Sequence, residues 1–263
     1  MERKQKKWWQ RSLALMLSLV LVVSSFLAGG IPVSYAADEG APLEVYVGSN
    51  GDKPGDGTWE NPYATLYDAY KAIPDKGTGT IYVLNNITLS PKEGAKFIEI
   101  SGEKNITITS PGTDTFVIKR DGEGTLFDLI NGQLKFKNII IDGNKFLNNG
   151  RIVNVYGSSR LIIEDGAILR NNDNNLTGSA VYISDVNSVV IMTGGEIIGN
   201  KQSPTSIGAT GAVVMYNGSF TMTGGKITGN SGGGVHVKGG EFNLSGNTDI
   251  TGNTVGESEQ NVY

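Results

Sequence analysis

Short runs in which apolar and polar residues alternate recur along most of the chain. AVYIS and VVIMT, AVVMY and SFTMT, and GVHVK and EFNLS are three successive pairs of such runs. A period of two over about four to six residues predicts a strand with one buried face. Each pair precedes Ile-x-Gly-Asn or a near copy of it, and the five asparagines of these copies are Asn144, Asn171, Asn200, Asn230 and Asn253.

The asparagines are spaced by 27, 29, 30 and 23 residues, which defines a structural repeat of that length. Three short strands per repeat, with no helix pattern between them, predict an all-β parallel solenoid in which each repeat forms one coil. Strands of successive coils would stack about 4.8 Å apart, so that equivalent residues lie over one another. The alternative is an antiparallel β-sandwich, which gives no reason for one corner residue to recur at a near-constant spacing.

Stacking gives the recurring asparagine a structural role. Asparagines at the same corner of successive coils can pair their amides in a ladder along the axis, which satisfies polar groups that are costly to bury unpaired. Inward apolar residues are expected to stack in columns in the same way. From the first strands these are Phe127, Leu129, Val153, Val155, Val181, Ile183, Val213, Met215, Val235 and Val237, and from the second strands Leu134, Phe136, Leu161, Ile163, Val190, Met192, Phe220, Met222, Phe242 and Leu244.

Residues 1–36 are predicted to be a signal peptide. Five basic residues precede an apolar run that extends from Ser12 to Ala28, and Ser34-Tyr35-Ala36 then supplies small residues where a signal peptidase cuts. The alternative is an uncleaved membrane anchor, because about seventeen apolar residues approach the length that spans a bilayer. After cleavage, no second segment of spanning length remains.

Residues 37–79 are predicted to form a strand, a loop and a capping helix, and residues 80–263 are predicted to form the coils. The helix pattern begins after Thr65, which can cap the helix together with Asp68. Its apolar residues share one face at helical spacing and are Leu66, Ala69, Tyr70 and Ile73. Such a helix would cover the apolar residues of the first coil, which no preceding coil buries.

The last residues, Asn261-Val262-Tyr263, repeat the beginning of a first strand, Gly234-Val235-His236. The sequence therefore stops a few residues into a coil, with no cap after it. An uncovered solenoid end offers unpaired backbone groups and apolar side chains to another chain. We expect either end-to-end self-association or continuation in a longer chain.

Charge and cysteine content narrow the classes of partner and compartment. The chain has 22 basic and 26 acidic residues; without residues 1–36, 17 basic and 25 acidic residues remain, a net charge of −8. This sign predicts no nucleic-acid partner and no attraction to anionic lipid. The chain has no cysteine, so disulfides do not stabilise it. The signal segment predicts a secreted or cell-surface location. The absence of cysteine from an exported protein is typical of a Gram-positive bacterium.

Two stretches resemble known proteins over residues 44–263. YVGSNGDKPGDGTWENPYATLYDAYKAI resembles the opening of bacterial right-handed parallel β-helix proteins of the pectate-lyase-like superfamily. The TGGEIIGN and TGGKITGN units resemble the repeats of Gram-positive surface and adhesin-like β-helix proteins. The resemblance implies a right-handed parallel β-helix. It leaves the activity open, because the superfamily contains polysaccharide lyases, glycosidases, phage tailspikes and non-catalytic adhesins.

The sequence lacks the catalytic motifs of those enzymes. The arginines after residue 36 are Arg120, Arg151, Arg160 and Arg170, none within a lyase-type motif, and the polygalacturonase-type signatures are missing. His236, the one histidine, alternates with inward valines and so faces outward. We therefore identify no catalytic residue. Lysine or arginine as the base and calcium as the counter-ion would be expected of a lyase.

Calcium is the one cofactor for which the sequence offers ligands. Asn50, Asp52 and Asp56 lie close together in a glycine-rich loop, although their spacing does not match an EF-hand. The simpler interpretation is a solvated turn in which Asp and Asn bond to their own backbone. We predict no metal site.

Outward residues of the first strands form two columns if the coils stack. One holds Asp128, Asn154, Tyr182, Val214 and His236, and the other holds Ile130, Tyr156, Ser184, Tyr216 and Lys238. The resemblance implies that sugar chains bind to this face in polysaccharide-active members of the superfamily, and tyrosine, amide and charged groups suit sugars. The candidate ligand-binding residues are Asn154, Tyr156, Tyr182, Tyr216, His236 and Lys238. The simpler explanation is that tyrosine favours exposed strands.

These observations favour a structural or adhesive module that binds a polysaccharide or a cell-surface glycan. The alternative is a carbohydrate-active enzyme, either a polysaccharide lyase or a glycosidase, or a fragment of one.

Overall fold

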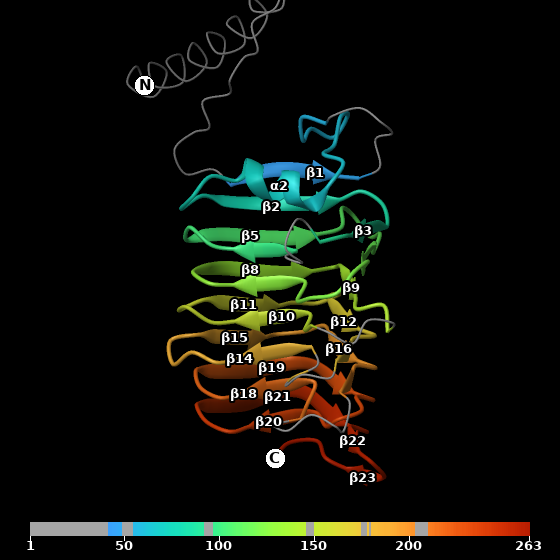
Figure 1. Ribbon diagram of the computed structural model, residues 1–263, viewed down its shortest axis with the longest axis vertical. Coiled ribbons are helices and arrows are strands. Elements are labelled where there is room, and N and C mark those ends of the chain that lie inside the picture. The colour runs from blue at the N-terminus through green and yellow to red at the C-terminus, as the bar shows by residue number, and fades with distance from the viewer. Residues whose placement is uncertain are drawn as a thin grey trace, which may run out of the picture. The chain divides into compact units, whose positions relative to one another are not determined.

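A computed structural model describes residues 42–48, 55–91, 97–145, 150–174, 178, 180–202 and 210–263. The predicted signal segment 1–36 and the residues Asn50 and Asp52 lie outside these ranges. Within them, the chain forms strands and one short helix, and the strands stack in coils along one axis (Figure 1). The prediction of an all-β parallel solenoid is confirmed.

Each full coil contributes one strand to each of three stacks. The first strands form a six-stranded sheet of β4 (Ile98–Ile100), β7 (Phe127–Leu129), β10 (Val153–Val155), β14 (Val181–Ile183), β18 (Val213–Met215) and β20 (Val235–Val237). The second strands are β1 (Leu43–Val47), β2 (Thr78–Val83), β5 (Lys104–Thr109), β8 (Gly132–Lys137), β11 (Arg160–Ile163) and β15 (Val189–Met192). The third strands are β3 (Ile87–Leu89), β6 (Val117–Arg120), β9 (Ile140–Asp142), β12 (Ile168–Arg170) and β16 (Glu196–Ile198).

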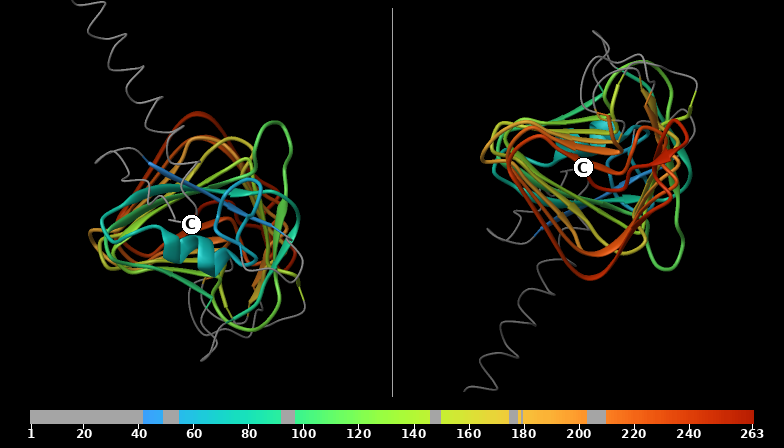
Figure 2. Two further views of the ribbon diagram at one scale, coloured as in Figure 1. Left: turned by 90° about the horizontal axis from the view of Figure 1, so that it is seen from above. Right: turned by 90° about the horizontal axis from the view of Figure 1, so that it is seen from below.

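Two long strands, β19 (Ser219–Thr228) and β21 (Glu241–Thr251), run through both the second and the third positions and join these stacks into one 13-stranded sheet. Two small sheets lie beside them, one of β13 (Asp173–Asn174) and β17 (Lys201–Gln202), the other of β22 (Thr254–Val255) and β23 (Ser258–Glu259). Among the described strands, every pairing is parallel except that of β22 with β23. Views along the axis show the coils lying over one another (Figure 2).

The repeated octapeptide has its explanation in the corners of the coils. In the copy at 223–230, Gly225 has a φ of +89° and Gly229 a φ of +62°. Both values lie in the left-handed region, which glycine reaches without steric cost. A β-carbon on Gly225 would also lie 2.7 Å from the backbone of Gly194 in the coil before it. Close approach of successive coils therefore requires glycine at this corner.

The interior is filled by the predicted apolar columns. The strand register places Phe127, Val153, Val181, Val213 and Val235 in one row, and each is fully buried. A second row runs from Leu134 through Leu161 and Val190 to Phe220. Burying one such side chain contributes about 1.5–3 kcal/mol, so these rows supply most of the stabilisation.

The last coil departs from the predicted burial. Phe242 is only half-buried, and Leu244 is 52% exposed. Their strand, β21, pairs with β19 on one side and has no strand on its other side among the described residues. The final residues begin a further first strand, since Val262 forms a parallel bridge with Val235.

At the other end, the helix α2 (Leu66–Ala72) lies beside β1 and β2 (Figure 1). Thr65 caps it as predicted: the Asp68 backbone N–H donates to Thr65 Oγ1 over 3.1 Å, and the Thr65 hydroxyl donates to the Asp68 carboxylate over 2.6 Å. Leu66, Ala69, Tyr70 and Ile73 are buried. The helix therefore covers the first coil in the way the sequence predicts.

A buried arginine in the core has no counterpart in the predicted pattern. Arg120, the last residue of β6, faces inward and is fully buried. Its Nη2 donates to the Arg151 backbone carbonyl over 2.6 Å, whereas Nε and Nη1 have no partner among the described residues. Burial lowers the pKa of Arg120 to about 10. The guanidinium is therefore charged at neutral pH in an environment that penalises the charge.

We expect Arg120→Met to stabilise the fold. The replacement removes two unpaired donors and a buried charge, and the Arg151 carbonyl keeps its hydrogen bond from the Leu126 backbone N–H. The free energy of unfolding, measured by urea denaturation, should rise by about 1–3 kcal/mol. Arg160→Met, at an exposed position of β11, is the matched control and should change stability little. A destabilised Arg120→Met protein would show that the guanidinium is net favourable.

Candidate functional site

The six-stranded sheet of first strands carries two outward rows. Register aligns Glu99, Asp128, Asn154, Tyr182, Val214 and His236 in the first row. The second row consists of the residues that directly follow the strands, namely Ile130, Tyr156, Ser184, Tyr216 and Lys238. The six predicted ligand-binding residues are therefore brought onto one face, which we call the tyrosine face (Asn154, Tyr156, Tyr182, Tyr216, His236 and Lys238).

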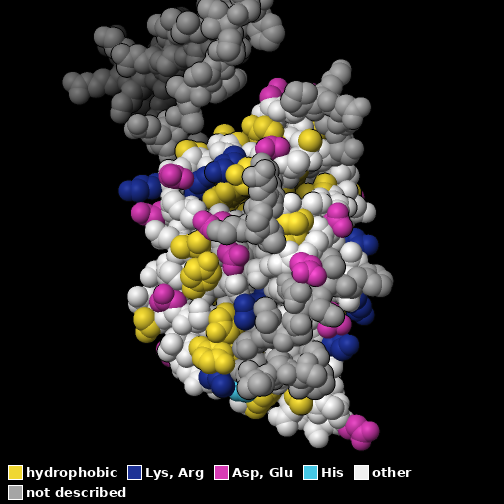
Figure 3. All heavy atoms as spheres, in the orientation of Figure 1, with side chains coloured by type: hydrophobic (Ala, Val, Ile, Leu, Met, Phe, Trp, Pro, Cys, Tyr) yellow, Lys and Arg dark blue, Asp and Glu magenta, His cyan; other side chains and the backbone are white. Residues whose placement is uncertain are grey.

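Two adjacent tyrosine rings of this face lie between two cations. The rings of Tyr182 and Tyr216 lie 5.6 Å apart at an angle of 55°. The Arg151 guanidinium lies 4.2 Å from the centre of the Tyr182 ring, and the Lys238 ammonium lies 4.9 Å from that of Tyr216. These are cation–π distances, so each cation restrains the ring beside it. On the side of the molecule seen in Figure 3, hydrophobic side chains lie next to basic ones.

A chain of hydrogen bonds orders the neighbouring polar groups. Arg151 Nη1 donates to Asn154 Oδ1 over 3.1 Å, and Asn154 Nδ2 donates to Asp128 Oδ1 over 2.7 Å. Burial lowers the pKa of Arg151, while the charges of Tyr182 and Asp128 act in the opposite direction. Asn154 is thus fixed between a cation and a carboxylate, with its amide oriented by both.

The acidic groups lie at the amino-terminal end of the face. Burial raises the pKa of Tyr156, and the negative charges of Asp128 and Glu99 raise it further. Lys238, which donates to the Tyr216 hydroxyl over 3.4 Å, lies at the other end. A ligand along this face would meet carboxylates first and cations later.

His236 is half-buried at the carboxy-terminal end of the face. Its Nδ1 lies 3.1 Å from the Thr210 carbonyl oxygen, and its ring centre lies 4.4 Å from that of Tyr263. Burial and the nearby charge of Lys238 lower its pKa, against the effect of the Thr210 carbonyl. The histidine is therefore bonded to backbone and packed on a ring, rather than free on a strand. Val214, its neighbour in the row, is buried although it faces outward.

Sequence reasoning missed Arg151. This residue lies two positions before β10, where the alternating pattern has not yet begun. Its side chain nevertheless reaches over the sheet to Tyr182 in the next coil. The sequence marks Arg151 only weakly, because its one distinguishing feature is that arginine is rare after residue 36, with four in all.

The loop weighed as a calcium site is only partly described, since Asn50 and Asp52 lie outside the described ranges. The carboxylate of Asp56 accepts from the backbone N–H of Thr58 over 3.0 Å and from its hydroxyl over 2.7 Å, as a turn residue does. Over the described residues, no three His, Cys, Asp or Glu side chains gather in a group that could hold a metal ion. In the same part of the chain, no helix has both the length and the hydropathy of a membrane span.

The family of the chain follows from comparison with family models. A model described as "Right handed beta helix region" matches residues 76–255. The chain belongs to the right-handed β-helix family. No curated protein and no solved structure matches it significantly.

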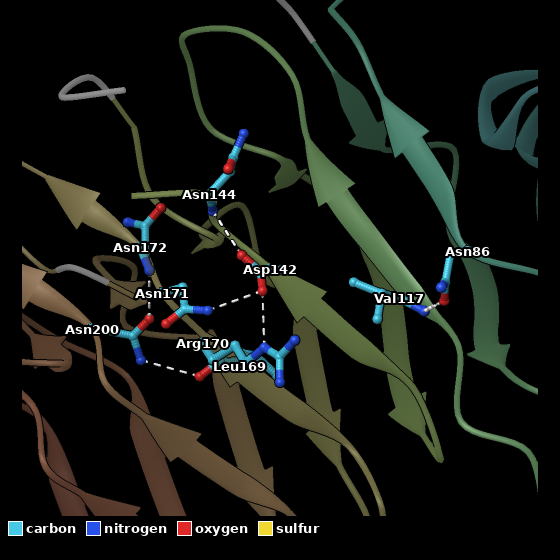
Figure 4. A network of polar contacts seen from close by, with 9 residues as sticks. All are labelled: Asn86, Val117, Asp142, Asn144, Leu169, Arg170, Asn171, Asn172 and Asn200. Atoms are coloured by element: carbon cyan, nitrogen blue, oxygen red, sulfur yellow. Dashed lines mark hydrogen bonds and ion pairs between the residues drawn. The ribbon is translucent and has the colours of Figure 1, made fainter. Parts of the chain in front are cut away.

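The β-helix holds a continuous row of asparagines at one corner, and Figure 4 shows its first members. Asn200 donates its backbone N–H and its Nδ2 to Asn230 Oδ1, over 3.0 and 3.1 Å, and Asn230 makes the same two bonds to Asn253 Oδ1, over 3.1 and 2.8 Å. Asn253 continues the pattern to Asn261 Oδ1. The Nδ2 atoms also donate to backbone carbonyls of the preceding coil, those of Leu169, Ile197 and Ile227.

Two of the predicted ladder residues lie elsewhere. Register pairs Leu169 with Ile197, and this places Asn172 opposite Asn200. The backbone N–H of Asn172 donates to Asn200 Oδ1 over 3.1 Å. Asn171 falls opposite Gly199 and shares its left-handed φ, 56° against 63°. The prediction of Asn171 is therefore wrong by one residue. It matches Ile168 to the isoleucine of the repeat, whereas Leu169 is the residue that faces inward at that position.

Asn144 is half-buried and also left-handed, with a φ of 58°. Its Nδ2 donates to the Arg120 carbonyl over 3.0 Å instead of to another asparagine. The asparagine row of the β-helix therefore begins at Asn172, one coil later than the sequence suggested.

We expect Asn230→Leu to destabilise the β-helix. Leucine fits a buried site but leaves the Ile197 carbonyl and the amide groups of Asn200 without the bonds that Asn230 provides. An unpaired buried polar group costs about 1–3 kcal/mol, so thermal unfolding should begin at a clearly lower temperature. Asn187→Leu, at an exposed turn, is the control and should melt close to wild type. Equal melting of both variants would mean that the buried amides contribute nothing.

Proposed function

We propose that this β-helix is a secreted or cell-surface module that binds a polysaccharide or cell-surface glycan through its tyrosine face. Its role is structural or adhesive rather than catalytic. The observation that carries the proposal is the ordered series Arg151, Tyr182, Tyr216 and Lys238, in which each ring lies against a cation or another ring.

The chemistry of this series suits an extended sugar polymer. Tyrosine rings pack against the apolar faces of sugars and offer hydroxyls at their edges. Asn154, Arg151 and Lys238 supply amide and charged donors for hydroxyl or carboxylate oxygens. Because the hydrogen bonds of Asn154 and the cation contacts already hold these groups, little side-chain entropy is lost on binding.

The repeat and the amino-terminal sequence support the rest of the proposal. The TGG-x-Ile-x-Gly-Asn units resemble those of adhesin-like β-helix proteins of Gram-positive bacteria, and residues 1–36 have the pattern of a secretory signal. A module at the cell surface meets glycans as its commonest polymers. Its regular strand face allows one polymer to contact several coils at once.

Replacement of Tyr156, Tyr182 and Tyr216 by alanine should abolish retention of the protein on its glycan. Affinity electrophoresis of the purified full chain through gels containing pectate, alginate or glycosaminoglycans, with calcium present, identifies the ligand and measures the loss. Circular dichroism should be unchanged, since outward side chains contribute little to the core. The matched control replaces three tyrosines away from the face, Tyr46, Tyr67 and Tyr82, and should keep its binding.

Two results would contradict the proposal. Retention of the triple variant at the wild-type level would remove the tyrosine face as the binding surface. A rise in ultraviolet absorbance from unsaturated products, or the release of reducing sugar, would identify the alternative function, a polysaccharide lyase or a glycosidase.

A further inference from the structure

A hollow of about 440 Å³ lies on the stack of third strands, away from the tyrosine face. It is formed over β3, β6, β9 and β12, and the polar residues that line it include Asn86, Lys119, Asp142, Lys145, Arg170 and Asn171. Register brings Lys119, Asp142 and Arg170 into one outward row of three successive coils. The corner residues Lys145 and Asn171 complete its rim.

Among the described residues that line the hollow, three are cations and one is a carboxylate. Asp142 is almost fully buried, and Figure 4 shows Arg170 and Asn171 both directed toward it. Its Oδ2 accepts from Arg170 Nε over 2.9 Å and from Asn171 Nδ2 over 3.0 Å, and its Oδ1 accepts from the Asn144 backbone N–H over 2.9 Å. Burial acts to raise the pKa of Asp142, but these hydrogen bonds outweigh it and lower the pKa. Asp142 is therefore a satisfied anion whose charge Arg170 balances.

Two positive charges then remain. Lys119 and Lys145 form no ion pair with any described residue, and the terminal nitrogens of Arg170 have no hydrogen-bond acceptor in the same part of the chain. Elsewhere on the third strands, by contrast, Lys226 lies 3.8 Å from the carboxylate of Glu196. Uncompensated cations in one hollow are unexpected in a chain with more acidic than basic residues. They indicate an anionic ligand.

We propose that this hollow binds a phosphate group. A phosphate ester carries a charge of about −1.5 to −2 at pH 7 and three strong acceptor oxygens, which matches two free ammonium groups and the outer edge of one guanidinium. Asn86 adds a neutral donor: its Oδ1 accepts from the Val117 backbone N–H over 2.9 Å, which leaves Nδ2 to face a ligand. A carboxylate, with a single charge and two oxygens, would leave one cation unpaired.

The site is independent of glycan binding by the tyrosine face, because the two lie on different strand stacks. The same phosphate chemistry can come from free inorganic phosphate or from a phosphate ester on a sugar. Inorganic phosphate and glucose 6-phosphate are therefore the two probes, and glucuronate and glucose are the carboxylate and neutral comparators.

Isothermal titration calorimetry of the full chain measures the dissociation constant of each probe and tests the proposal. Low ionic strength is used because charge interactions are least screened there. Phosphate should bind saturably, and the double variant Lys119→Gln with Lys145→Gln should bind about ten-fold more weakly or worse, as expected for the loss of charge-assisted hydrogen bonds. Lys226→Gln, an outward lysine of the same sheet, is the matched control and should bind as wild type. Both substituted lysines are at the surface of the hollow, so unchanged melting temperatures verify the fold.

The relative affinities of the two probes distinguish free inorganic phosphate from a sugar phosphate as the ligand. Tighter binding of glucose 6-phosphate than of phosphate would indicate a sugar phosphate, and the reverse would indicate the free anion. Absence of saturable binding by both probes would overturn the proposal, as would equal affinity of the double variant and wild type. Glucuronate binding as tight as that of phosphate would overturn the assignment of the phosphate group.

Discussion

The parallel register between successive coils is the constraint on which the rest of the structure depends. The first strands pair from coil to coil without a register shift, so residue types must repeat at the coil spacing for equivalent residues to lie over one another. The pairing of β19 with β21 has one register shift, between Met222 and Gly224. Apolar rows fill the interior, and Asn172, Asn200, Asn230, Asn253 and Asn261 pair along one corner. Arg120 departs from this pattern, since two of its buried guanidinium nitrogens have no hydrogen-bond partner among the described residues.

The same register organises the outer surface, where no core packing restricts the side chains. On the first strands it places Tyr182 and Tyr216 in two adjacent outward rows, where their rings lie 5.6 Å apart. On the third strands it aligns Lys119, Asp142 and Arg170 beside a hollow. A solenoid thus separates the inward rows, on which stability depends, from the outward rows, through which we propose that ligands bind. The two surfaces differ in chemistry: one is aromatic with mixed charge, and the other is concave and basic.

Basic side chains lie on both of these outward surfaces. The chain is acidic overall, yet Arg151 and Lys238 lie against rings of the tyrosine face, and Lys119, Lys145 and Arg170 line the hollow. Arg151 and Arg170 are each held by a neighbouring acceptor, Asn154 and Asp142, so that each guanidinium is fixed through one of its nitrogens. Such anchored cations lose little freedom when they bind a ligand, whereas an unrestrained surface lysine loses more.

The sequence by itself determined the coil length, the inward columns before the last coil, the capping helix and the strand residues of the tyrosine face. These follow from local periodicity, which a parallel stack preserves because neighbouring coils repeat the same pattern. Only the tertiary structure decided that Asn172 and not Asn171 joins the asparagine row, since a shift of one residue depends on which of Ile168 and Leu169 packs inward. It also decided that Arg151 lies over Tyr182 and that Lys119, Lys145 and Arg170 share one hollow. Those contacts are between residues of different coils, and they depend on the conformation of loops and the orientation of side chains. The periodicity of the sequence specifies neither.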